Sequence, residues 1–118
     1  MKERDIEKHL VKRVKQLGGE VRKVQWVGRV GAPDRLVMLP DRLKPLNLMR
    51  PLAKDEIVYD ETICAQTIWV ELKNPDTVKT FPANAHERAQ HREHQRMRAM
   101  GQRVEVIGTI EQVEELLR

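Results

Sequence analysis

Cysteine is almost absent from this sequence of 118 residues, and its scarcity excludes several classes of protein. The one cysteine, Cys64, rules out an intramolecular disulfide and a multi-cysteine zinc site, which fits a reducing compartment. No apolar run is long enough to span a bilayer, and the N-terminus lacks the apolar segment of a signal peptide. We therefore expect a cytoplasmic protein with no membrane segment.

Length and charge narrow the class further. A chain of this length is expected to form a single domain over residues 1–118, with a modest core. Charged residues make up 34% and apolar residues 40%, which is too apolar for a disordered chain. Lys plus Arg (22) exceed Asp plus Glu (18), and the sequence pI is about 9.5, which favours a polyanionic partner.

Hydrophobic spacing predicts alternating helices and strands. Helices are expected over residues 5–17, 85–100 and from 109 onwards, and strands over 20–27, 35–39, within 68–75 and over 103–107. Residues 74–84 are expected to be a loop. Residues 41–66 are expected to leave the core as an excursion, with a short strand at 56–59. This order predicts a mixed α/β domain with a small central sheet flanked by helices.

The segment Ile68–Pro75 carries the residues best suited to chemistry. Side chains two residues apart in a strand point to the same face, so Glu71 and Lys73 share one face while the residues between and before them enter the core. Upstream, Pro33 has no backbone N–H to donate and therefore fits the approach to a strand. Asp34 then lies at the start of the strand expected over residues 35–39, at one end of the sheet.

These three polar residues suggest a site for phosphodiester hydrolysis. If Asp34 and Glu71 are neighbours, the two carboxylates repel unless a hard divalent cation such as Mg²⁺ joins them. Lys73 could then orient or activate a metal-bound water, or stabilise charge on a phosphate. Because these residue types are common, their spacing alone also fits a solvated strand edge.

Four segments of the sequence carry a family resemblance. They are Glu3–Leu10 with Glu7, Gly31–Leu39 with Asp34, Trp69–Lys73, and Gln90 in a helix that ends before Gly101. In this order they resemble the VRR-NUC nucleases, a branch of the PD-(D/E)xK superfamily. The main departure is the excursion at residues 41–66. The absence of further domains resembles the stand-alone phage or bacterial type.

The resemblance implies a restriction-endonuclease-like core that hydrolyses DNA with Mg²⁺ or Mn²⁺. By position in the family pattern, Asp34 and Glu71 would bind the metal together with the backbone carbonyl of Leu72. Lys73 would act on the attacking water. Stand-alone members resemble enzymes that cut branched DNA such as four-way (Holliday) junctions. Cutting two strands symmetrically requires two active sites, so a homodimer is expected.

Two further residues take their roles from the same resemblance. Glu7 would hold a second metal or its water shell, and Gln90 would fix a metal-bound water or the lysine. Glu20 is a rival to Glu7, because it begins a strand that could lie against Asp34. The family pattern favours the helix position, so Glu7 is the prediction.

The helix expected over residues 85–100 is rich in arginine. Its buried stripe is expected to contain Ala89, Glu93, Met97 and Met100, with Ala99 beside it. Most arginine-rich amphipathic helices are simply solvated. Beside a nuclease site, basic residues become candidates for contacts to DNA phosphates, and we predict that role for Lys79, Arg88, Arg92 and Arg96.

Two alternatives remain at this stage. A basic nucleic-acid-binding module could keep the fold without cutting, although the presence of all of Asp34, Glu71 and Lys73 favours the endonuclease. Three histidines, His86, His91 and His94, lack the four-residue spacing of a helical zinc pair, which disfavours zinc.

Overall fold

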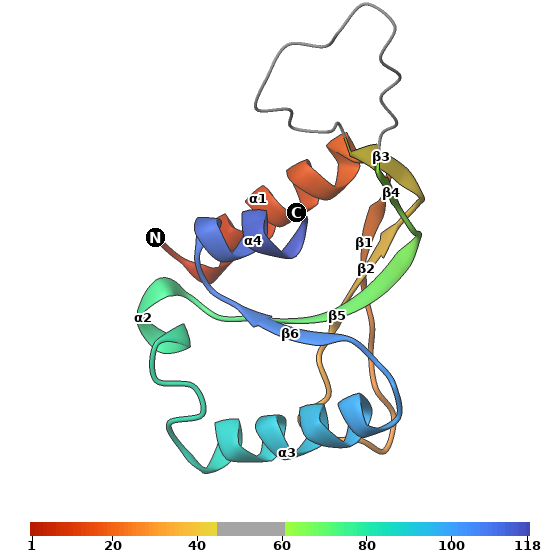
Figure 1. Ribbon diagram of the computed structural model, residues 1–118. Coiled ribbons are helices and arrows are strands. Elements are labelled where there is room, and N and C mark those ends of the chain that lie inside the picture. Colours follow the sequence, from red (N-terminus) through yellow and green to blue (C-terminus); the bar gives the residue numbers. More distant parts are fainter. Residues whose placement is uncertain (45–60) are drawn as a thin grey trace, which may run out of the picture.

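The computed structural model describes residues 1–44 and 61–118 (Figure 1). The helices are α1 (Glu3–Gln16), α2 (Pro75–Val78), α3 (Ala85–Ala99) and α4 (Ile110–Leu116). The strands are β1 (Glu20–Lys23), β2 (Arg35–Leu39), β3 (Arg42–Lys44), β4 (Glu61–Ile63), β5 (Gln66–Leu72) and β6 (Val104–Ile107). The predicted mixed α/β class is therefore confirmed.

A four-stranded mixed sheet organises the domain, with strand order β1-β2-β5-β6. The first three strands pair antiparallel, and β6 pairs parallel to β5. A parallel pair needs a crossover connection, and α3 lies in the chain between β5 and β6. Because β5 lies between β2 and β6, it is an interior strand. Its C-terminal end meets α3.

The apolar core lies on the face of the sheet that α1 and α4 cover. Ile6, Leu10 and Val14 come from one stripe of α1, and all three are fully buried. They pack with residues of the sheet and α4, namely Val37, Leu39, Ile68, Val70, Leu72, Ile107, Val113, Leu116 and Leu117. Each buried aliphatic side chain contributes about 1.5–3 kcal/mol. Figure 1 shows α3 on the opposite side of the sheet from α1 and α4.

Two element boundaries near the N-terminus differ from the prediction. The first helix starts at Glu3 rather than residue 5, because the Asp5 carboxylate accepts a hydrogen bond from the Lys2 N–H at 2.8 Å and completes the first turn. β1 ends at Lys23 rather than residue 27. Beyond Val24, whose N–H donates to the Asp34 carbonyl at 2.9 Å, the chain leaves the ladder and forms a loop back to β2.

The segment predicted as a loop at residues 74–84 contains the one-turn helix α2. Asn74 caps it by accepting from the N–H groups of Asp76 and Thr77, and Pro75 occupies the first helical position, where its missing N–H costs nothing. The excursion begins and ends in the β3–β4 ribbon, and β5 already starts at Gln66. The strand predicted at 56–59 lies outside the described residues.

The predicted buried stripe of α3 was only partly right. Met97 and Glu93 are buried, but Met100 is 68% exposed and Ala99 is also exposed, because the helix ends at Ala99 and the chain turns away at Gly101. The buried face is instead formed mainly by polar side chains, which are Glu87, Gln90, Glu93 and His94 together with Met97. A polar layer therefore separates α3 from the sheet.

Candidate active site

Asp34 lies opposite Glu71 where β2 meets β5. The ladder pairs Arg35 with Val70, and continuing that register by one residue brings Asp34 beside Glu71. Residues directly opposite in antiparallel strands point to the same face, with Cβ atoms about 4.5–5.5 Å apart. Glu71 is only 8% exposed, whereas the Asp34 side chain is 59% exposed. The two carboxylates thus occupy neighbouring positions, one buried and one open to solvent.

Trp26 holds the chain in place just before Asp34. Its indole N–H donates to the Pro33 carbonyl at 2.7 Å, and its ring packs against Trp69 with the centroids 5.1 Å apart. The two tryptophans therefore fix the approach of the Asp34 loop to β5.

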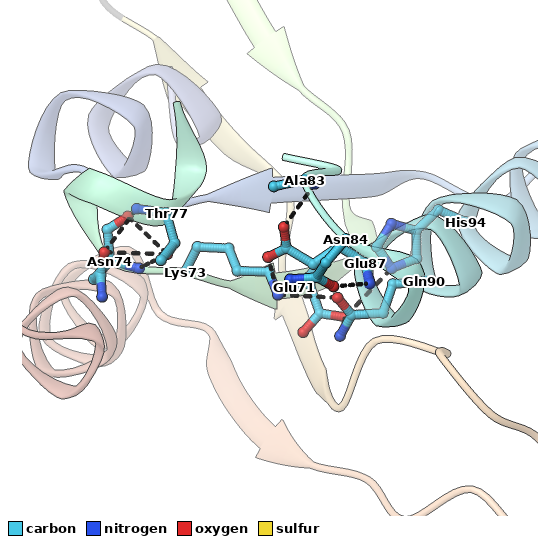
Figure 2. Close-up of polar contacts among 9 residues, drawn as sticks. All are labelled: Glu71, Lys73, Asn74, Thr77, Ala83, Asn84, Glu87, Gln90 and His94. Carbon is cyan, nitrogen blue, oxygen red and sulfur yellow. Dashed lines mark hydrogen bonds and ion pairs between the residues drawn. The ribbon is translucent and has the colours of Figure 1, made fainter. Parts of the chain in front are cut away.

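Lys73 follows the last residue of β5 and is held by α3. Its backbone N–H donates to the Ile107 carbonyl at 2.8 Å, which extends the pairing with β6. Its Nζ donates to Gln90 Oε1 at 2.9 Å and forms an ion pair with Glu87 Oε2 at 3.2 Å (Figure 2). The same Nζ lies 5.2 Å from the centre of the Phe81 ring. The ammonium group is therefore fixed from several sides.

Gln90 connects the lysine to the buried acid. Its Oε1 accepts from Lys73, while its Nε2 donates to Glu71 Oε1 at 3.2 Å (Figure 2). The carboxamide of Gln90 therefore accepts a hydrogen bond through its oxygen and donates one through its nitrogen. The structure brings this predicted site residue next to both partners, and its role in catalysis stays a prediction.

Glu87 and His94 also belong to this polar layer, and sequence reasoning missed both. Glu87 Oε1 accepts from the Ala83 N–H at 2.9 Å, and this bond, followed by the charge of Lys73, lowers the pKa of Glu87. His94 is fully buried, with Nε2 3.4 Å from Glu71 Oε1. The sequence did contain a signal for them. Glu87 precedes Gln90 by three residues and His94 follows it by four, a spacing that places all three polar residues on one face of a helix.

Glu7 is bound to an arginine of β2. Arg35 Nη2 lies 3.1 Å from Glu7 Oε2, and Arg35 Nη1 lies 2.9 Å from Asp34 Oδ1. The arginine therefore links the predicted helix acid to the strand acid. Whether Glu7 contributes to a metal site remains a prediction.

A second acid of α1, Glu3, lies within the electrostatic field of the site. Burial raises its pKa, Lys73 opposes that rise, and the negative charges of Glu71 and Asp34 add to it. Glu3 precedes Glu7 by one helical turn, so both carboxylates share a flank of α1. Sequence reasoning considered only Glu7, although this spacing was visible.

Glu20, the rival to Glu7, lies away from Asp34. The β1–β2 ladder pairs Glu20 with Met38, at the end of β1 opposite to the Val24–Asp34 contact. Its carboxylate instead pairs with Arg22 at 2.7 Å. The suggestion that Glu20 could lie against Asp34 was therefore wrong, because the antiparallel register separates them.

The donor chemistry of the site fits a hard divalent cation. Within residues 1–44 and 61–118, no three His, Cys, Asp or Glu side chains form a ready metal cage. Mg²⁺ needs fewer protein ligands, because it binds one or two carboxylates and keeps several waters. Asp34, Glu71 and the Leu72 carbonyl would supply hard oxygen donors. Glu71 contacts two residues of α3, Gln90 and His94, and both contacts involve Oε1 rather than Oε2.

The predicted phosphate-contacting residues are on the surface. All four are exposed, namely Lys79, Arg88, Arg92 and Arg96. The three arginines follow the outer flank of α3, away from the face that carries Glu87 and Gln90. Arg96 also pairs with Glu93 at 2.9 Å. Their contact with nucleic acid stays a prediction.

The mixed sheet with one polar face, and the Asp34, Glu71 and Lys73 side chains where β2 begins and β5 ends, define a restriction-endonuclease-like nuclease fold. The chain is similar over nearly its whole length to a solved structure described as "VRR_NUC domain". The two share 31% sequence identity with a TM-score of 0.62, and the match covers 98% of this chain and 92% of the other. The chain belongs to the VRR_NUC family.

A second relative is known from sequence. The chain is 51% identical over 41 residues to "Putative nuclease p44" of Acyrthosiphon pisum secondary endosymbiont phage 1. This match covers 35% of the chain and 44% of that protein, so it spans less than half of the curated relative. No protein-family model matches the chain. No helix in the described residues is both long and apolar enough to cross a membrane.

Proposed function

We propose that this protein is a divalent-metal-dependent DNA endonuclease that hydrolyses phosphodiester bonds. The observation that carries the proposal is the position of Asp34 opposite Glu71, with Gln90 joining Glu71 to Lys73. Membership of the VRR_NUC family and the partial match to a phage protein named as a nuclease support the same activity.

Asp34 and Glu71 would hold Mg²⁺ or Mn²⁺ together with the Leu72 carbonyl, and an acid of α1 would complete the site. The bound cation would polarise the scissile phosphate and lower the pKa of an attached water. The ammonium of Lys73 would orient the attacking water or offset charge that develops on the phosphate. Its contacts with Glu87 and Gln90 keep it in place before substrate arrives.

The family resemblance further suggests branched DNA, such as four-way junctions, as the substrate. A junction presents two strands for symmetric cutting, which requires two active sites and hence a homodimer. The exposed arginines of α3 are proposed to contact DNA phosphates, which would position the substrate without reading its sequence.

The test is cleavage of a labelled panel comprising a four-way junction, a flap, a linear duplex and a single strand. Each is incubated with Mg²⁺ or Mn²⁺ and, separately, with a chelator. Wild type is compared with Asp34→Asn and with a matched control, Glu111→Gln, which removes one exposed carboxylate on α4. We expect metal-dependent cutting of branched substrates by wild type and the control, and none by Asp34→Asn.

Two outcomes would overturn parts of this proposal. Cutting of linear and branched DNA at equal rates would retain the nuclease and reject the structural selectivity. Absence of cutting on every substrate, with salt-sensitive binding retained by all three proteins, would identify a binding module that keeps the fold without catalysis. Sedimentation of the same samples measures whether the active species is a dimer.

A further inference from the structure

A row of basic side chains follows one flank of α1. Arg4, Lys8, Lys12 and Lys15 recur at intervals of three or four residues, so they lie along one side of the helix, and all are exposed. With Glu7 and Val11 they line an open groove of about 560 Å³. Val11 is 42% exposed in this groove, which is high for an aliphatic residue. We call this surface the α1 groove.

The basic side chains of the α1 groove have no ion-pair partner in the part of the chain that the structure describes. None of its four basic side chains forms an ion pair with a carboxylate there, whereas other arginines do: Arg13 with Glu114, Arg22 with Glu20, and Arg118 with Glu115. Among the described residues that line the groove, the one acid is Glu7, and it is already bound to Arg35. The groove therefore has an excess of positive charge and is suited to an anionic ligand.

The α1 groove is linked to the candidate active site by two ion pairs. Glu7 lines the groove and also binds Arg35, whose guanidinium contacts Asp34 at 2.9 Å. Towards the other end, Val11 and Lys15 border a second hollow against β1. From Arg4 to Lys15 the helix rises about 16 Å. One strand of duplex DNA carries about five phosphates over that length.

We propose that the α1 groove binds the sugar–phosphate backbone of a nucleic-acid arm next to the cleavage site. The lysine ammonium groups contact phosphates, while Val11 and the lysine methylene stems pack against sugars. This proposal rests on the proposed nuclease function. α1 and the arginine-bearing α3 lie on opposite sides of the sheet (Figure 1), so two basic surfaces diverge from one site. That arrangement suits a substrate with two diverging arms.

The test measures binding without cleavage, in chelator, to a four-way junction and a linear duplex over a range of salt concentrations. Lys8→Gln/Lys12→Gln is compared with a matched control, Arg13→Gln/Arg118→Gln, which removes two positive charges that already pair with carboxylates. Each phosphate contact contributes about 0.9 to the slope of log affinity against log salt. We expect the groove variant to lose about two units of slope on the junction and the control to lose none.

Equal slopes for the groove variant, the control and wild type would overturn the proposal. A shift of the groove variant from dimer to monomer in sedimentation, with its salt slope unchanged, would also overturn it, because a second copy of the chain would then occupy the groove. Neither result depends on catalysis, so failure here is distinct from failure of Asp34→Asn to abolish cleavage. Thermal unfolding of each variant verifies that it is folded.

Discussion

The Nζ atom of Lys73 lies 3.2 Å from Glu87 Oε2, so an acid of α3 holds the lysine that β5 presents. Glu87 is itself anchored by the Ala83 N–H. Lys73 directly follows β5, whereas Glu87 lies in α3, and α2 separates the two elements along the chain. The position of the ammonium therefore depends on how α3 docks against the sheet.

Glu87→Gln is expected to slow cleavage by about tenfold, equivalent to about 1.4 kcal/mol, while DNA binding is unchanged. The amide keeps the shape of the side chain but removes the charge that orients Lys73. The control is Glu93→Gln, the same substitution on the same buried face, whose partners are Arg96 and Arg29 rather than Lys73. Single-turnover rates at saturating enzyme measure the effect. Equal rates for both variants would show that Gln90 alone positions the lysine.

Glu3 and Glu7 are expected to behave differently when metal is added. Glu3→Gln should reduce the rise in Tm that Mn²⁺ produces, because the Glu3 carboxylate interacts with the charges of Glu71 and Asp34. Glu7→Gln should lower stability without metal, because Arg35 loses its carboxylate partner, but should keep the Mn²⁺ increment. The opposite pattern in calorimetric scans would assign the metal site to Glu7, as the sequence predicted.

The sequence predicted the parts of this fold that depend on periodic patterns. The stripe Ile6, Leu10 and Val14 identified the buried face of α1, and the alternation at Glu71 and Lys73 identified the polar face of β5. Both depend only on the repeat of a helix or a strand. The order along the chain of the four segments that contain Glu7, Asp34, Glu71 with Lys73, and Gln90 suggested the family.

Contacts that depend on tertiary docking were not predictable in this way. The predicted buried stripe of α3 contained Glu93 and Met97 correctly but ended at Met100, and it omitted three polar residues that are buried, namely Glu87, Gln90 and His94. A helix that packs over a polar layer breaks the rule that buried faces are apolar. The pairing of Glu7 with Arg35 was likewise invisible, because it joins residues 28 apart on different elements.

Gly31→Ala is expected to destabilise the protein by about 1–3 kcal/mol, the cost of holding a non-glycine residue in the left-handed region, and to slow cleavage. Gly31 has φ 86°, and a Cβ there would lie 3.0 Å from the Ala89 carbonyl oxygen and 3.0 Å from Gln90 Cα. Gly28→Ala is the matched control, since Gly28 has φ 76° but no atom within 4 Å of the added Cβ. The control should lose stability through backbone strain alone and keep its cleavage rate. Chemical denaturation and single-turnover rates separate the two effects.

The ion pairs between α1 and α4 predict a pH dependence of stability. His9 Nε2 lies 2.8 Å from Glu114 Oε1, and this contact, followed by that of Arg13, lowers the pKa of the Glu114 carboxyl. A carboxyl group whose pKa is lowered by folding stabilises the fold at pH values above its pKa in the unfolded chain, about 4.3. This stabilisation is lost as the pH falls through its pKa in the folded protein. Wild type should therefore exceed Glu114→Gln in stability at pH 6, and the difference should shrink below about pH 4. A constant difference across that range would contradict the prediction.

His94 is buried without a hydrogen bond to either ring nitrogen in the described part of the chain, although it stacks on Phe81 with ring centroids 5.9 Å apart. An unsatisfied buried polar group costs about 1–3 kcal/mol, which is a high cost for a residue that only fills space. His94→Leu should therefore be at least as stable as wild type in chelator. The same variant should cleave more slowly, because Glu71 Oε1 loses the imidazole 3.4 Å away.

Greater stability combined with lower activity would mean that the histidine is kept for the site. A loss of more than about 2 kcal/mol would instead mean that His94 makes a hydrogen bond that stabilises the fold.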